Sequence, residues 1–136
     1  MKKSESNVPM MILRIFLGVA FLIAGLDKIL SFDGTKGMFE GMFGGAGFAM
    51  LLLAIVIEIV GGISLVSGYW IKYSAPVLGV LIFVAFVATF KLGMAPNIVA
   101  TLREIFVMNT GGGNTAVNLA FLAGLVSLTV NEWLQE

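Results

Sequence analysis

The sequence contains no cysteine and no histidine. Without cysteine, the chain cannot form a disulfide, a CxxC redox pair, a thiolate nucleophile or a cysteine-ligated iron–sulfur cluster. Without histidine, it lacks the usual general base near neutral pH and the common ligand of haem and zinc. Any chemistry must therefore use carboxylates, lysine, arginine, tyrosine, methionine or a bound cofactor. We predict no catalytic residue and no metal site.

Charge is also scarce. Charged residues make up 12% of the 136 residues, against about 25% in a typical soluble domain. Hydrophobic residues make up 59%, and the mean hydropathy is +1.03. So few polar side chains cannot cover a compact core in water, so we expect a lipid bilayer around most of the chain. The 8 basic residues are balanced by 8 acidic ones, which leaves no excess charge for binding nucleic acid.

Four apolar stretches are long enough to cross a bilayer, which takes about 20 residues. They cover residues 8–30, 48–69, 74–92 and 115–130, and the fourth is long enough if it tilts little. Pro76, near the start of the third stretch, suits a first helical turn, where a missing N–H costs little. The sequence therefore predicts an all-α integral membrane four-helix bundle. The length predicts a single transmembrane domain over residues 1–136.

The first and third loops each contain a short amphipathic segment. In the first loop, apolar residues recur at helical spacing and stop at a glycine pair: Met38, Phe39, Met42 and Phe43, then Gly44 and Gly45. In the third loop, Asn97 is placed to cap a helix that three glycines end: Ile98, Leu102, Ile105 and Phe106, then Gly111, Gly112 and Gly113. Both segments predict short interfacial helices.

The connections also constrain the topology. Residues 70–73 join the second and third spans so tightly that these helices must be antiparallel neighbours. Four spans place both termini on the same side of the membrane. The basic residues do not choose that side, because four lie on each: Lys2, Lys3, Arg14 and Lys72 against Lys28, Lys36, Lys91 and Arg103.

Glu58 lies near the middle of the second span. An ionised carboxylate there costs several kcal/mol unless it is paired or hydrated, so it either meets a cation or stays protonated. It is interpreted either as a proton-accepting or ligand-binding group, or as a structural hydrogen-bonding residue. Arg14 is the obvious partner, because it lies roughly 9 Å from the terminal-side boundary and Glu58 roughly 16 Å. Its side chain points away from the midplane, however, so the alternative is that Arg14 reaches the headgroups.

Two helix faces carry small residues around these charges. On the first span the face contains Arg14, Gly18, Phe21, Gly25 and Lys28. On the second it contains Ala54, Glu58, Gly62, Leu65 and Tyr69, with Gly61 adjacent. Such faces are typical of ordinary helix packing in membranes. They also suggest that the two faces meet and enclose a polar pocket around Glu58, which would admit a ring-shaped apolar ligand such as a quinone.

Two further positions carry polar side chains near the ends of the spans. We expect Asp27 and Lys28 to form a solvated pair at the membrane interface, near Lys91 at the end of the third span. Asn118, one turn into the fourth span, is expected to bridge helices through its amide. The candidate ligand-binding residues are Glu58, Arg14, Gly18, Gly25, Lys28, Gly61, Gly62, Tyr69 and Asn118.

These motifs together resemble the DoxX family. The segment RIFLGVAFLIAGLDKI is similar to its first helix, EIVGGISLVSGYWIKYSAPVLG to its second helix and turn, and NLAFLAGLVSL to its fourth helix. The resemblance covers residues 14–128 and implies a four-helix protein of the bacterial or archaeal inner membrane with cytoplasmic termini. One branch of the family resembles subunits of thiosulfate:quinone oxidoreductase, another is associated with oxidative-stress complexes, and distant relatives behave as membrane chaperones.

Three functional hypotheses follow. The first is a non-catalytic membrane subunit of a redox or oxidative-stress complex, which docks a redox protein and binds quinone near Glu58, with Arg14 tuning the carboxylate. The chain has no evident electron carrier, so a partner or bound cofactor would move the electrons. The second hypothesis is a non-enzymatic scaffold or chaperone, and the third is a small proton-coupled transporter. The small-residue faces also permit a homo-oligomer.

Overall fold

The computed structural model describes residues 7–89, 97–107 and 115–135. Every regular element in these ranges is helical, as predicted. The long helices are α1 (Val8–Leu30), α3 (Gly47–Ser67), α4 (Ile71–Thr89) and α6 (Thr115–Leu134). The shorter ones are α2 (Phe32–Phe43), the single 3-10 turn η1 (Gly44–Ala46) and α5 (Ile98–Phe106).

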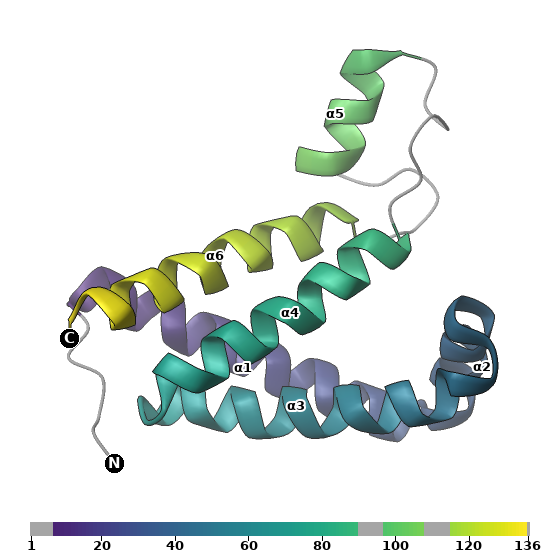
Figure 1. Cartoon of the computed structure of the whole chain (residues 1–136), viewed down its shortest axis with the longest axis horizontal. Coiled ribbons are helices and arrows are strands. Elements are labelled where there is room, and N and C mark those ends of the chain that lie inside the picture. Colours follow the sequence, from purple (N-terminus) through teal and green to yellow (C-terminus); the bar gives the residue numbers. More distant parts are fainter. Residues whose placement is uncertain (1–6, 90–96, 108–114, 136) are drawn as a thin grey trace.

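The four long helices form two packed pairs. α1 packs mainly against α3, α4 packs mainly against α6, and the α3–α4 contact joins the pairs (Figure 1). α1 begins and α6 ends at one end of the bundle, whereas α2 and α5 lie at the opposite end (Figure 1). All four long helices are long and apolar enough to cross a membrane. The predicted four-span architecture with two additional short helices is therefore confirmed.

Both short helices begin or end where the sequence predicts. The Asn97 side chain accepts a hydrogen bond from the Ala100 N–H at 2.8 Å, which caps α5. α2 ends at Gly44, whose φ of 64° places it in a conformation that favours glycine. The three glycines expected to end α5 lie outside the described residues, and the helix already stops at Phe106.

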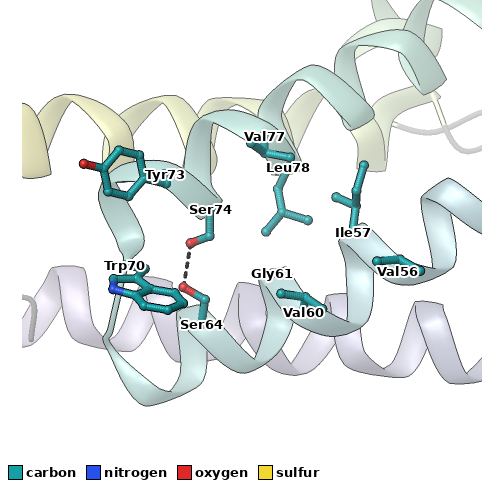
Figure 2. Close-up of a pocket in the computed structure, with 10 residues that line it drawn as sticks. All are labelled: Val56, Ile57, Val60, Gly61, Ser64, Trp70, Tyr73, Ser74, Val77 and Leu78. Atoms are coloured by element: carbon teal, nitrogen blue, oxygen red, sulfur yellow. Dashed lines mark hydrogen bonds between the residues drawn. The ribbon is translucent and has the colours of Figure 1, made fainter. Parts of the chain in front are cut away.

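The turn between α3 and α4 occupies only Gly68 to Trp70. Gly68 ends α3 in the left-handed conformation, with a φ of 86°. The Trp70 carbonyl then accepts hydrogen bonds from the Tyr73 and Ser74 N–H groups at 3.1 and 2.9 Å, which starts α4. The Ser64 and Ser74 hydroxyl oxygens hydrogen-bond across the turn at 2.8 Å (Figure 2). α3 and α4 are therefore antiparallel neighbours, as predicted.

The position expected for Pro76 was wrong. Because the Trp70 carbonyl starts the helix early, α4 begins at Ile71 and Pro76 lies within it rather than in its first turn. Pro76 has no N–H to donate to the carbonyl of Lys72 four residues earlier. The other limits differ from the expected spans by a few residues, and α6 continues to Leu134.

Glycines bring the α1 and α3 backbones into near contact. A Cβ atom added at Gly18 would lie 2.9 Å from the Gly62 carbonyl oxygen and 2.7 Å from the Val66 side chain. A Cβ atom added at Gly62 would lie 2.9 Å from the Gly18 carbonyl oxygen. The two small-residue faces therefore meet, which is close packing of the kind that small residues permit in membranes. Gly61 faces α4 instead, where an added Cβ would lie 2.8 Å from the Leu78 side chain.

α2 folds back over the start of α3. Phe39, the one buried residue of α2, packs against Leu51 and Ala54 of α3. An added Cβ at Gly47 would lie 2.6 Å from the Glu40 Cα, so this contact also needs a glycine. α2 is thereby held across the end of the bundle that faces away from the α3–α4 turn (Figure 1).

We predict that Gly18→Ala destabilises the protein. The added methyl group meets backbone atoms of α3, and overpacking of this kind costs about 1 to 3 kcal/mol. Gly79→Ala is the matched control, because a Cβ atom at Gly79 of α4 meets nothing within 4 Å, so its stability should be unchanged or higher. Unfolding in mixed detergent micelles measures both. Equal effects of the two substitutions would contradict the close α1–α3 contact.

Candidate functional site: the cavity beside Glu58

Glu58 forms a buried ion pair with Lys28. The Lys28 Nζ lies 2.8 Å from Glu58 Oε1 and 3.1 Å from Oε2, and it donates a hydrogen bond to Oε2. The Glu58 side chain is 5% exposed and that of Lys28 20%. The expected pairing of Glu58 with Arg14 was therefore wrong. The expected solvated Asp27–Lys28 pair was wrong as well, because Lys28 turns to Glu58 while Asp27 stays exposed. Lys91 lies outside the described residues.

The direction of helical side chains explains this pairing. Side chains on a helix lean toward its N-terminus. Lys28 is near the C-terminal end of α1, so its side chain leans toward the middle of the membrane, where Glu58 lies. Gly25, one turn earlier, lets α1 pass close to α3 at this point: an added Cβ there would lie 2.6 Å from the Ile59 side chain and 3.5 Å from the Glu58 Cβ.

Arg14 binds the end of α3 instead. Its Nη1 donates to the Leu65 carbonyl oxygen at 2.8 Å and lies 3.4 Å from that of Val66. The last carbonyls of a helix have no partner within the helix and carry partial negative charge, so a cation stabilises them. Arg14 is 4% exposed, so it does not extend to the headgroups either. Its role in the structure is to hold the α3 C-terminus against α1.

A cavity of about 350 Å³ lies beside the ion pair. Its size is within the range of small-molecule sites, about 300 to 1,000 Å³. Its polar lining consists of Glu58, Lys28 and Asn118. The remaining lining is apolar and includes four aromatic rings, two methionines of α2 and two alanines of α4: Phe21, Phe39, Phe43, Phe121, Met38, Met42, Ala85 and Ala88. Five helices contribute to this lining.

The polar groups leave hydrogen-bonding capacity unused. The Glu58 carboxylate is buried against Lys28, so the unused capacity lies with Lys28 and Asn118. A lysine ammonium has three donors, and a carboxamide has two donors and an acceptor. The half-buried Asn118 side chain makes no hydrogen bond to the described residues, so the expected bridge between helices is absent among them. These groups can therefore bind a ligand that is mostly apolar and carries a few oxygen atoms.

The structure separates the predicted site residues into three places. Glu58, Lys28 and Asn118 line the cavity, with Gly25 beside Glu58. The remaining glycines form helix contacts: Gly18 and Gly62 between α1 and α3, and Gly61 between α3 and α4. Arg14 and Tyr69 lie toward the other end of α3 and line no part of this cavity.

Sequence reasoning missed the contribution of α2 and α4. The apolar spacing of Met38, Phe39, Met42 and Phe43 was visible and predicted an interfacial helix. It did not indicate that this helix covers a cavity, because that depends on how α2 folds back on α3. The C-terminal half of α4 contains no charged residue and no glycine that could have indicated a site.

A second groove, between α3 and α4, differs in chemistry. It has a volume of about 280 Å³, with valine side chains along its walls and Trp70 and Tyr73 at one end (Figure 2). Its polar side chains, Ser64 and Ser74, are hydrogen-bonded to each other. No charged residue lines this groove. The Glu58 cavity is therefore the candidate functional site.

Four apolar spans around a buried ion pair define a multi-pass helical membrane protein. A model of the DoxX family matches residues 10–92, which is more than half of the chain. The chain therefore belongs to the DoxX family. The inner membrane protein YqjF of Escherichia coli (strain K12) is 37% identical over 75 residues, which cover 55% of each chain. The match thus spans about half the length of this curated relative. No solved structure matches the chain.

We predict that Lys28→Met lowers stability strongly in the native background and weakly in a Glu58→Gln background. Removing one partner of a buried ion pair leaves an uncompensated charge, at a cost of about 3 to 5 kcal/mol. Once Glu58 is neutral, the same lysine substitution removes no ion pair. Unfolding of the two single variants and the double variant gives the coupling. Asp27→Asn is the control and should leave stability unchanged. Purely additive effects of the substitutions at positions 28 and 58 would rule out the Lys28–Glu58 ion pair.

We expect no energetic coupling between substitutions of Arg14 and Glu58. Leu65, which accepts its hydrogen bond, is seven residues from Glu58, or about 10 Å along the helix. Substitutions this far apart without shared partners add within about 0.5 kcal/mol. The stability loss of Arg14→Gln should therefore be the same with and without Glu58→Gln, as measured by the same unfolding assay. A large coupling between positions 14 and 58 would instead indicate a direct interaction of Arg14 with Glu58.

Proposed function

We propose that this protein is a membrane subunit that holds a quinone in the Glu58 cavity for a redox partner protein. The observation that carries the proposal is a lysine–glutamate pair in a mostly apolar cavity of ligand size. Buried ionisable groups within a membrane are costly and mark functional sites more often than other residues. A quinone is soluble in the bilayer, so it can reach a cavity among spanning helices.

The lining fits a quinone ring. Phe21 and Phe121 form one aromatic pair, with ring centroids 5.7 Å apart, and Phe39 and Phe43 form another, at 5.9 Å. Such rings favour stacked or edge-on contacts with a planar ligand. Lys28 and Asn118 have N–H donors for the oxygen atoms of a quinone.

The chain itself binds and orients rather than transfers electrons. Its residues include no cysteine or histidine to hold an iron–sulfur cluster or a haem. The quinone supplies the redox chemistry when it is bound, and a partner protein exchanges electrons with it. The apolar wall keeps water from the ring, and the ion pair and Asn118 fix its orientation. Arg14, which binds the α3 carbonyls, has no part in this site.

We predict that quinone copurifies with the protein in mild detergent at about one molecule per chain. Ala88→Phe should weaken quinone binding by about tenfold or more, since a steric loss of about 1.4 kcal/mol has this effect. Ala88 lines the cavity. Ala123→Phe, on the exposed face of α6, is the matched control and should retain the quinone.

Extraction of the purified variants and chromatography of their lipids measure this stoichiometry. Only bulk lipid in all samples would exclude quinone binding and favour the scaffold hypothesis. Substrate-driven proton uptake into liposomes, lost in Glu58→Gln, would favour the transporter.

A further inference from the structure

We infer that α2 is a lid on the Glu58 cavity, which unfolds locally and so lets a ligand enter from the bilayer. The inference rests on the proposed function for the identity of that ligand, whereas the opening is a property of the chain alone. Two observations carry it. The α2 helix forms part of the rim of the cavity, and its sequence weakens it as a helix.

The α2 wall of the cavity reaches the surface of the protein. Met38 and Met42 line the cavity, yet they are 55% and 36% exposed. A side chain that lines a cavity and is also exposed lies at its rim. Val84 of α4 and Val117 of α6 are exposed lining residues as well. The mouth of the cavity therefore lies between α2 and the α4–α6 pair, and lifting α2 from α3 widens it.

Few contacts hold α2 in place. Phe39 is its one buried residue, and it packs against Ala54 of α3. The Phe32 ring meets the Phe48 ring edge-on, and the Lys36 ammonium lies 5.3 Å from the centroid of the Phe48 ring. Within the part of the chain that the structure describes, no side-chain hydrogen bond or ion pair joins α2 to another helix. Lifting α2 thus breaks no polar interaction between side chains.

Three glycines weaken α2 as a helix without being needed for its packing. Gly34, Gly37 and Gly41 lie within α2, and a Cβ atom added at any of them would meet nothing within 4 Å. Compared with alanine, each glycine inside a helix lowers the equilibrium constant for helix formation about fivefold. The three together therefore favour local unfolding of α2 by a factor on the order of a hundred. Gly44 and Gly45 follow directly, at the joint with α3.

An opening at the side of the bundle suits a ligand with a long apolar tail. The cavity of about 350 Å³ has room for a substituted ring but not for an isoprenoid chain as well. The tail then stays in the lipid while the ring occupies the cavity. Methionines at the mouth suit this passage, because their unbranched side chains adapt to a passing or bound ligand. Lids over binding sites are drawn from the least stable segments of proteins, and α2 is such a segment.

The test compares the native chain with the triple variant Gly34→Ala/Gly37→Ala/Gly41→Ala in lipid nanodiscs. The open space at these positions accommodates the methyl groups, so the closed structure is retained. Amide hydrogen exchange of α2, followed by mass spectrometry, measures local unfolding. We expect this exchange to slow by about fivefold for each alanine. Gly79→Ala, in similarly open space on α4, is the control and should leave the exchange of α2 unchanged.

A thiol placed beneath α2 measures access to the cavity without any ligand. The chain has no cysteine, so Ala54→Cys adds a single thiol at a lining position that is 2% exposed and packs against Phe39. Its rate of reaction with N-ethylmaleimide should fall in the triple variant by the same factor as the hydrogen exchange. Ala123→Cys, on the exposed face of α6, should react at the same rate in both backgrounds.

Ligand exchange then connects the opening of α2 to the quinone. Nanodiscs loaded with a decyl-tailed benzoquinone are mixed with its deuterated form, and mass spectrometry of the bound fraction gives the exchange rate. This rate should also fall in the triple variant by the same factor. The Kd should be unchanged, because the alanines stabilise the closed helix equally with and without the ligand.

The outcomes separate the inference from the proposed function. Unchanged hydrogen exchange of α2 in the triple variant would overturn the lid. Slower hydrogen exchange with unchanged thiol labelling or unchanged quinone exchange would also overturn it, because α2 would then unfold without controlling access. Absence of quinone binding to the native chain would remove the proposed function, and slower thiol labelling would still support the lid. The single variant Gly37→Ala gives the same comparison with a smaller change if the triple variant does not fold.

Discussion

The close approach of α1 and α3 is the constraint on which the rest of the structure depends. Gly18 and Gly62 bring the two backbones to a distance that no side chain fits. Because the helices run antiparallel in this contact, the two cations of α1 meet α3 at different depths, one near its middle and one at its C-terminal end. Arg14 reaches the terminal carbonyls of α3, and Lys28 reaches Glu58. One packing contact thus compensates two cations, a carboxylate and the terminal carbonyls of α3, each of which would be costly in lipid.

The two cations of α1, Arg14 and Lys28, have different roles. The Arg14 interaction is with backbone, is buried, and lies away from the cavity, so it serves the packing of helices. The Lys28–Glu58 pair lines a cavity of ligand size. Its place in that cavity is therefore the feature that favours a ligand.

Several local features followed directly from the sequence. Residues 8–30 form a helix with the predicted limits, Asn97 caps α5, and a glycine ends α2 at residue 44. These depend on apolar length and on capping chemistry, both of which act within a few residues. Apart from the position of Pro76 within α4, the wrong expectations concerned side-chain partners. Arg14 was assigned to Glu58 by depth alone, although the lean of helical side chains argued against it, and the same rule favours Lys28.

The sequence by itself determined that this chain lies in a membrane, how many times it crosses, and that Glu58 must be compensated. Those results follow from hydropathy and from the cost of a charge in lipid, which need no knowledge of neighbouring helices. Only the tertiary structure decided which cation compensates Glu58 and that α2 and α4 complete a cavity around it. The reason is that a pairing and a cavity depend on the relative rotation and depth of helices, and residues far apart in the sequence set these through packing.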